Sequence, residues 1–432
     1  MAPVEAKANG SHLTARVAAL PLSPTIPGHE TRSAAGAALN TPGAEDGQTD
    51  MARRALSGVL DTQTGLPIDE LGLLRSVDVE GSTVRVGLAL PAELACTTDT
   101  LSDAVASALG ALEGIERVEV LCGEMTMPER DEAAARLHAA RAELATKLSD
   151  GRTKLIAVAS GKGGVGKSTV TVNLACALAA QGERVGVVDL DVWGYSVPRM
   201  LGVSVRPIAF GDTLLPVQAH GVRTVSVGLL VEDEVTPVVW RGPLLHETVG
   251  QFLAGVYWGK LDVLLADLPP GTGDVPISLA TIARDAQVLV VTTPQEAAER
   301  VAERAGRMAR HAGLRLAGVI ENMAGFACPN CGEALDIFGR AGGAELARRL
   351  AVPLLGRIPL SPAVRAAGDA GRPIVVDDPD NPAAQAFVDT AGRVGRASRT
   401  VVRKRLPLSV VAVPAAGGAS HYAVASVPGG GK

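Results

Sequence analysis

The sequence Ser160-Gly-Lys-Gly-Gly-Val-Gly-Lys-Ser-Thr169 follows directly on the aliphatic run Leu155-Ile-Ala-Val-Ala159. A helical pattern of apolar residues follows over 168–181. The glycine-rich segment has the spacing G-x-x-x-x-G-K-S, which between a strand and a helix is typical of a phosphate-binding loop. The stretch therefore predicts a strand, a tight loop, and a helix whose N-terminus faces an anion.

The residue types of this loop suit a bound nucleoside triphosphate. Its glycines let backbone N–H groups converge on an anion without side-chain clashes. Lys167 is expected to reach the β- and γ-phosphates, and Ser168 to ligate Mg²⁺. Lys162 is either a solvated surface lysine or a second cation within reach of phosphate oxygens, those of its own chain or of a facing subunit. The candidate nucleotide-binding residues are Gly161, Lys162, Gly163, Gly164, Val165, Gly166, Lys167, Ser168 and Thr169.

Two acidic clusters follow predicted strands further along the chain. Asp189-Leu-Asp191 ends one aliphatic run, and Asp267 ends another. Because the carboxyl ends of parallel strands form the edge at which such sheets bind ligands, we expect Asp191 and Asp267 at the phosphate site. Asp267 has the position of a carboxylate that holds Mg²⁺ or one of its waters. Asp189 and Asp274 are interpreted either as site residues or as caps of the segments that follow them.

From residue 154 to about 395, aliphatic strand candidates alternate with helical stretches. This alternation predicts an α/β fold, a P-loop NTPase with a mostly parallel sheet flanked by helices. A small α/β domain precedes it. The strand candidates are 155–159, 184–189, 223–228, 262–267, 287–292, 315–320 and 353–358.

Composition shifts divide the chain into five predicted parts. The N-terminal part is rich in Ala, Ser, Thr, Pro and Gly without an apolar period, so a disordered extension is expected there. The parts are the extension 1–50, the small α/β domain 53–125, a charged helical linker 126–152, the P-loop domain 153–396 and a flexible tail 397–432.

Composition also limits where the chain works and what it binds. The 432 residues carry a net charge of −5, which gives no electrostatic case for nucleic acid or an anionic membrane. No apolar run approaches the roughly 18–20 residues of a membrane span, and the N-terminus lacks a signal-peptide pattern. Five cysteines, an odd count without such a signal, indicate the reducing cytoplasm.

Cys328-Pro-Asn-Cys331-Gly332 is the second informative motif. Its proline presets a turn and its glycine permits backbone amides to face the sulfurs, as in a metal knuckle. A [4Fe–4S] cluster or a structural Zn²⁺ takes about four protein ligands, and one chain offers two thiols here. A two-fold homodimer would bring four thiolates around one site. Zn²⁺ in that site and a redox dithiol are the alternatives, whereas Cys176, within an apolar helix, is interpreted as a core thiol.

Several motifs in order carry a resemblance to a known family. The loop Lys162-Gly-Gly-Val-Gly-Lys-Ser-Thr resembles the deviant Walker A motif of MinD/ParA proteins. Over about 154–395 the chain resembles the Mrp/ApbC family of iron–sulfur cluster carriers. The motifs are the loop, Asp189-Leu-Asp191, Val239-Trp-Arg-Gly-Pro243, Asp267-Leu-Pro-Pro-Gly-Thr-Gly-Asp274, Thr292-Thr-Pro-Gln295, Glu321-Asn-Met323 and the Cys-x-x-Cys pair.

The resemblance implies an ATPase that binds a bridging [4Fe–4S] cluster and passes it to apo-proteins. By the same resemblance Lys162 crosses a nucleotide-sandwich dimer to the partner's nucleotide, Asp191 positions the attacking water and Asn322 contacts the adenine. The segment 53–122 is similar to the small metal–sulfur cluster assembly domain often fused ahead of this ATPase. Its family stretch Asp-Pro-Glu is replaced by Asp61-Thr-Gln-Thr64, and Cys96 is its candidate functional cysteine.

Two other functions fit parts of the sequence. A partitioning ATPase of the ParA/MinD kind would bind DNA or membrane and would not need the Cys-x-x-Cys pair. A nucleotide switch with a structural zinc would use the pair as a staple and would be colourless. The iron–sulfur carrier uses both motifs and is the interpretation we favour.

Overall fold

The computed structural model describes residues 44–149, 153–192, 194–230, 242–328, 331, 333–397, 408–413 and 421–426. Most of the predicted extension and residues 239–241 of the quoted motifs lie outside these ranges. The first helix, α1 (Ala44–Leu56), begins inside the predicted extension, so residues 44–50 belong to this helix. Its last turn carries Arg53 and Arg54, and Leu56 is buried. Helix-dipole complementarity and one buried face explain why the helix starts earlier than the composition suggested.

An eight-stranded sheet forms the centre of the P-loop domain, in the order β15-β12-β11-β4-β10-β5-β9-β8. All neighbouring strands are parallel except β8, which runs antiparallel to β9 at one edge. This confirms the predicted α/β fold class. The strands are β4 (Lys154–Ser160), β5 (Val185–Asp189), β8 (Val217–Ala219), β9 (Val222–Ser226), β10 (Val263–Asp267), β11 (Gln287–Thr292), β12 (Arg315–Asn322) and β15 (Leu354–Ile358).

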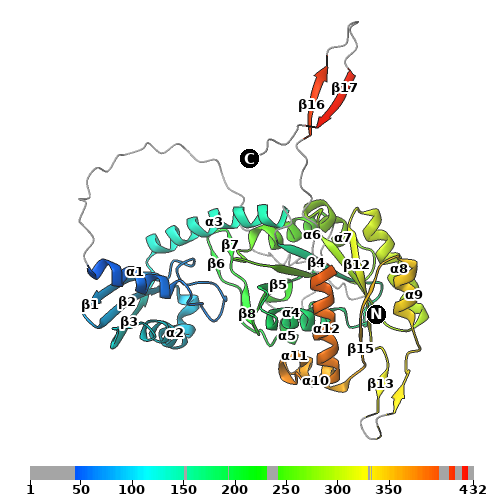
Figure 1. Cartoon of the computed structure of the whole chain (residues 1–432), viewed down its shortest axis with the longest axis horizontal. Helices are drawn as coiled ribbons and strands as arrows, with labels where there is room; N and C mark the ends of the chain where they lie inside the picture. Colours follow the sequence, from blue (N-terminus) through cyan, green and yellow to red (C-terminus); the bar gives the residue numbers. More distant parts are fainter. Residues whose placement is uncertain are drawn as a thin grey trace, which may run out of the picture.

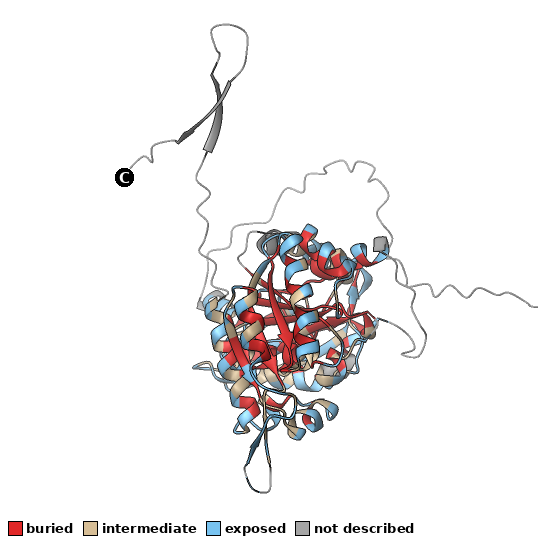
Figure 2. Ribbon diagram, turned by 90° about the vertical axis from the view of Figure 1, so that its right-hand side faces the viewer, coloured by how far each residue is buried: buried red, intermediate tan, exposed pale blue. Residues whose placement is uncertain are grey.

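Helices cover both faces of this sheet because its strands are aliphatic on both faces. One buried cluster packs helix α4 (Lys167–Ala180) and helix α12 (Pro382–Ala397) against one face. A second cluster packs four helices against the other face, and Figure 2 shows the strands buried between the layers. Those helices are α6 (Gly242–Gly250), α7 (Asp274–Ile282), α8 (Glu296–His311) and α9 (Gly342–Arg349).

The small domain is a three-stranded sheet, in the order β1-β2-β3, packed against α1 and α2. Helix α3 leads from it to the P-loop domain (Figure 1), where the helical linker was predicted. The domain's buried cluster also includes Phe210 and Tyr257 of the P-loop domain, so the two domains share one core. The elements are β1 (Leu74–Glu80), β2 (Thr83–Leu90), α2 (Thr98–Gly110), β3 (Arg117–Glu124) and α3 (Met127–Ser149).

Polar contacts fix the docked position of the small domain. The Arg223 guanidinium donates to the carbonyl of Gly65 in the small domain and, at 2.7 Å, to the carbonyl of Trp258. The Tyr257 hydroxyl donates to the Glu70 carboxylate at 2.7 Å. The backbone N–H of Gln218 in edge strand β8 donates to the carbonyl of Gln63 in the small domain at 2.7 Å. The small domain therefore covers part of the sheet edge. Covering an edge strand protects it from pairing with other chains.

The predicted flexible tail contains regular structure that the sequence analysis missed. Strands β16 (Leu408–Val413) and β17 (His421–Ser426) pair as an antiparallel hairpin. The β-branched run Ser409-Val-Val-Ala-Val413 favours this conformation over an irregular tail.

Replacing Arg223→Ala is expected to loosen the small domain. The substitution leaves the carbonyls of Gly65 and Trp258 without this donor, and hydrogen bonds to a charged group contribute about 1.5–3 kcal/mol each. Limited proteolysis followed by mass spectrometry should show faster cleavage within 57–67 than in wild type. Arg117→Ala, which removes an exposed arginine within the small domain, is the matched control. Equal cleavage rates in both variants would contradict a docking role for Arg223.

Candidate functional site

The glycine-rich loop lies between the end of β4 at Ser160 and the start of α4 at Lys167. Gly166 caps the helix in the left-handed region at φ 80°, which favours glycine. A Cβ at Gly161 would lie 2.3 Å from the backbone of Val301 and Ala302 in α8, so the loop also needs glycine for this close approach. The predicted strand–loop–helix arrangement is therefore present, with backbone N–H groups at the N-terminus of a 14-residue helix.

A pocket of about 490 Å³ opens in front of this loop. Its lining combines residues of the glycine-rich loop, residues of the loop after β5 that carries Asp191, and the two prolines after Asp267. Its volume and the charged and hydroxyl side chains among its lining residues suit a nucleotide phosphate chain. The lining residues are Ser160, Lys162, Gly163, Gly164, Gly166, Lys167, Ser168, Thr169, Asp191, Gly194, Ser196, Met200, Pro269 and Pro270.

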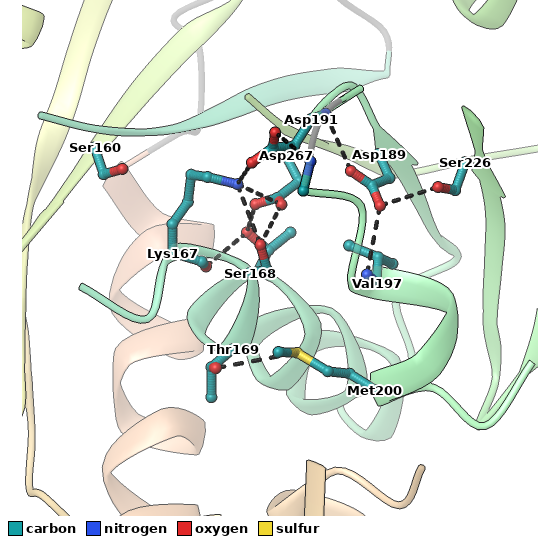
Figure 3. Close-up of polar contacts among 12 residues, drawn as sticks. Ser160, Lys167, Ser168, Thr169, Asp189, Asp191, Val197, Met200, Ser226 and Asp267 are labelled. Atoms are coloured by element: carbon teal, nitrogen blue, oxygen red, sulfur yellow. Dashed lines mark hydrogen bonds and ion pairs between the residues drawn. The ribbon is translucent and has the colours of Figure 1, made fainter. Parts of the chain in front are cut away.

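Asp267 is the centre of the polar network behind the loop, and its side chain is fully buried. Its Oδ2 accepts from Lys167 Nζ at 2.5 Å and from Ser168 Oγ at 2.6 Å (Figure 3). Its Oδ1 accepts from Thr171 Oγ1 at 2.6 Å. The sequence analysis missed Thr171, although its position four residues after Lys167 on one helix face is the signal that could have found it. The hydroxyl and carboxylate are hard oxygen ligands of the kind that Mg²⁺ prefers.

Asp191 lies on the other side of Lys167. One of its carboxylate oxygens is 3.5 Å from Lys167 Nζ, and the other accepts from the backbone N–H of Gly194 at 3.2 Å. Burial raises the pKa of Asp191, and the charge of Lys167 opposes this shift. The structure therefore brings Lys167, Ser168, Asp191 and Asp267 together, as the two acidic clusters predicted.

Asp189 contacts the loop that carries Asp191, not the phosphate loop itself. Its carboxylate accepts from the backbone N–H of Asp191 at 3.1 Å, from Ser226 Oγ at 3.0 Å and from the backbone N–H of Val197 at 3.4 Å (Figure 3). Burial, followed by the charge of Asp267, raises the pKa of Asp189 to about 7. These contacts match the capping interpretation for Asp189. Asp274 is the first residue of α7, where the N-cap is Gly273, so its carboxylate complements the helix dipole and does not cap the helix.

Lys162 and Asn322 contact neighbours on either side of the phosphate loop. Lys162 is half-buried, and its Nζ donates to Gln295 Oε1 at 3.2 Å. Asn322 Nδ2 donates to the carbonyl of Val165 at 2.9 Å. The predicted contacts of Lys162 with a partner's nucleotide and of Asn322 with adenine stay predictions.

Cys328 and Cys331 lie on a hairpin built from β13 (Phe326–Ala327) and β14 (Ala334–Leu335), which projects from the body of the P-loop domain (Figure 1). Cys328 is half-buried and Cys331 is exposed. Pro329, Asn330 and Gly332, on which the predicted knuckle geometry depends, lie outside the described residues. Within the described part of the chain, no group of three or more His, Cys, Asp or Glu side chains could hold a metal ion. Cys331 is thus accessible and Cys328 partly so, and the count argument for a shared site still applies.

The other cysteines differ from this pair. Cys176 is buried in α4, and burial raises the pKa of its thiol to about 12. Cys122 is exposed on β3, where its sulfur lies 3.5 Å from Ser102 Oγ. Cys96 lies in the short 3₁₀ helix Ala92–Thr97, and its side chain lies outside the described residues.

Iodoacetamide at pH 8 should modify Cys331 rapidly and Cys176 only after unfolding. Because the thiolate is the nucleophile, a pKa near 12 lowers the reactive fraction by at least about a hundredfold relative to an ordinary thiol. Peptide mass spectrometry over a time course measures both rates, with Cys122 as the exposed reference. Labelling of native Cys176 at the rate of Cys331 would show that α4 is not the closed core helix described here.

Two family models match this chain, one over each of its two domains. A family described as NUBPL iron-transfer P-loop NTPase matches residues 151–395, and one described as iron–sulfur cluster assembly protein matches residues 49–122. An iron–sulfur cluster carrier protein of Mycobacterium leprae is 44% identical over 363 residues, covering 82% of this chain and 94% of the relative. A carrier protein of Synechocystis is 37% identical over 353 residues, covering 80% and 96%.

A solved structure is similar to the P-loop domain. The ADP-bound nucleotide-binding protein of Archaeoglobus fulgidus is 37% identical, and the alignment covers 57% of this chain and 96% of that chain at a TM-score of 0.49. No described helix is both long and apolar enough to cross a bilayer. The family matches confirm the resemblance that the motifs indicated. The chain therefore belongs to the Mrp/ApbC family of iron–sulfur cluster carrier proteins, P-loop NTPases of the NUBPL type, here preceded by an iron–sulfur cluster assembly domain.

Proposed function

We propose that this chain binds and hydrolyses ATP with Mg²⁺ at the glycine-rich loop. The observation that carries the proposal is the buried contact of Asp267 with both Lys167 and Ser168 behind an open pocket. This arrangement holds a cation and a hydroxyl where a phosphate chain and its metal would need them. Ser168 and Asp267 would hold Mg²⁺, which would supply positive charge against the negative charge that develops on the phosphate.

The chain's own residues then have separable tasks in hydrolysis. Lys167 and the loop amides hold the phosphates, so they supply most of the electrostatic stabilisation. Asp191 orients the attacking water, and its raised pKa suits a carboxylate that accepts a proton. Lys162 adds a second cation at the loop, on its own chain or across a dimer.

The transported substrate in this proposal is a [4Fe–4S] cluster on Cys328 and Cys331. Each chain supplies two thiols on an exposed hairpin, half of the usual ligand set, so a homodimer is proposed to share one cluster. A cluster held between subunits on exposed hairpins would be accessible to apo-protein clients. The family membership and the reduced state expected of the cysteines support a cytoplasmic carrier. A partitioning role is less well supported because it leaves the cysteine pair unused.

Lys167→Ala should lower ATP hydrolysis by at least about a hundredfold, since it removes a cation that is worth several kcal/mol to the transition state. Phosphate release measured under saturating ATP gives the rate, and cluster loading after anaerobic reconstitution should persist. Because the substitution leaves two buried carboxylates without their cation, Asp191→Asn is the second test of the same step. Lys260→Ala, an exposed lysine away from the loop, is the control. Hydrolysis at the wild-type rate in both test variants would contradict the assignment.

Cys328→Ala and Cys331→Ala should each prevent stable cluster binding while leaving ATP binding intact. The reason is stoichiometric, because each substitution removes two of four thiolates from a shared site. Absorbance near 400 nm with iron, sulfide and zinc analysis of reconstituted dimers measures the loss, and Cys122→Ala is the matched exposed control. Retained colour in both variants would refute the ligand assignment. Stoichiometric zinc in colourless wild-type protein would instead favour the structural staple.

A further inference from the structure

The hairpin that carries Cys328 and Cys331 is part of a longer excursion, which we name the cysteine arm and define by the described residues 323–328, 331 and 333–341. It leaves the sheet at the end of β12 and returns at the start of α9. Backbone hydrogen bonds of 2.8 Å tie its first residues to β15 and the segment after it, from Ala324 N–H to the Ile358 carbonyl and from Leu360 N–H to the Gly325 carbonyl. The position of the two thiols therefore depends on what holds these two stems.

Glu321 holds both stems with one carboxylate. Its side chain is fully buried, and its Oε1 accepts from the backbone N–H of Gly343 in the first turn of α9 at 2.7 Å. Its Oε2 accepts from Arg357 Nε at 2.7 Å, across the β12–β15 pairing. The residue that precedes α9, Ala341, has no side-chain hydrogen-bonding group, so Glu321 supplies the acceptor for this helix end. A buried carboxylate with a donor at each oxygen fixes geometry strongly, because each lost partner is costly.

The next residue, Asn322, joins the incoming stem to the phosphate loop. Besides donating to the Val165 carbonyl at 2.9 Å, its Nδ2 lies 2.2 Å from where a Cβ at Gly166 would be. The two glycine-loop residues in contact with Asn322 immediately precede Lys167. A change in the direction of the Val165 carbonyl therefore acts directly on the strand end that starts the cysteine arm.

The outgoing stem reaches the phosphate loop by a second route. A Cβ at Gly342 would lie 2.7 Å from the carbonyl oxygen of Pro294, so the start of α9 packs directly on the residue before Gln295. Gln295 accepts the hydrogen bond from Lys162. A bound phosphate that attracts Lys162 would therefore weaken its hydrogen bond to Gln295. Gln295 directly follows Pro294, the residue on which the start of α9 packs.

We propose that Glu321 and Asn322 are positioning residues that couple the state of the phosphate loop to the position of the cysteine arm. The inference rests on the proposed function for the identity of the transported substrate, but the coupling concerns this chain's own residues. A nucleotide shifts the arm only by the difference in its affinity for two arm positions. Two contacts between the phosphate loop and the stems provide this difference in affinity. The Val165 carbonyl accepts from Asn322, and Lys162 donates to Gln295.

Hydrogen–deuterium exchange on the full-length, cluster-free protein tests this coupling without relying on hydrolysis or transfer. With saturating Mg²⁺ and a non-hydrolysable ATP analogue, wild-type amides in 321–343 should change their exchange rates by at least threefold. In Glu321→Gln, whose amide can accept from only one side so that either Gly343 N–H or Arg357 Nε loses its acceptor, and in Asn322→Ala, this nucleotide-dependent change should fall below half of its wild-type size. Occupancy is verified by titration, since Asn322 is also a predicted adenine contact. Glu345→Gln, in an exposed pair with Arg348 on α9, is the control and should respond as wild type.

A merely structural role gives a different result, because it would loosen the arm equally with and without nucleotide. A full nucleotide response in both test variants, or no response of the arm in wild type, would overturn the proposal. Thermal unfolding followed by circular dichroism identifies a variant that does not fold, in which case the other variant decides. Cluster loading of wild type is measured separately, so failure of the carrier function and failure of the coupling are distinguishable.

Discussion

The buried ion pair between Asp267 and Lys167 is the constraint on which the site depends. A carboxylate without exposed surface at the end of β10 is tolerated only because three donors from α4 satisfy it. Removing one partner of such a pair commonly costs about 3–5 kcal/mol. The interaction therefore fixes the first turn of α4 against the sheet and, with it, the direction of the loop amides. Parallel register places Asp267 beside Asp189 on β5, so the same contact also sets where the Asp191 loop begins.

Much of the fold could be predicted from local patterns, and the limits of that prediction are physical. Aliphatic runs identify the parallel strands because both faces of each strand are buried, and glycine spacing identifies the phosphate loop. The contacts of Gln295 and Glu321 join segments far apart in sequence, so no local period reports them. The antiparallel edge strand Val217–Ala219 is too short to produce a clear alternation. Nothing in the sequence around Phe210 and Tyr257 indicates that these side chains belong to the core of the small domain.

The cysteine arm, unlike the phosphate site, is not held in place by buried contacts of its own. Its two paired strands contain only two residues each, and Leu335 and Ile337 remain 43% and 54% exposed. A short isolated hairpin is marginally stable, so it cannot hold two thiols in a fixed position by its own packing. Order must come from its stems, which is why the fully buried Glu321 in β12 matters more than any residue within the hairpin. An accessible pair of thiols on a rigid base suits a ligand that has to arrive and leave.

The positions of the small domain and the cysteine arm along the sheet limit whether the small domain can contact the thiols. It contacts the edge formed by β8 and β9, whereas the cysteine arm leaves from β12, the neighbour of β15 at the opposite edge (Figure 1). Six strand spacings separate β8 from β12, which at about 4.8 Å each amounts to about 29 Å. A small domain docked in this way cannot touch the thiols of its own chain. Any direct exchange between them requires either release of the docking contacts around Arg223 or the arm of another protomer. Because those contacts are a shared apolar core as well as hydrogen bonds, release is the costlier route within one chain.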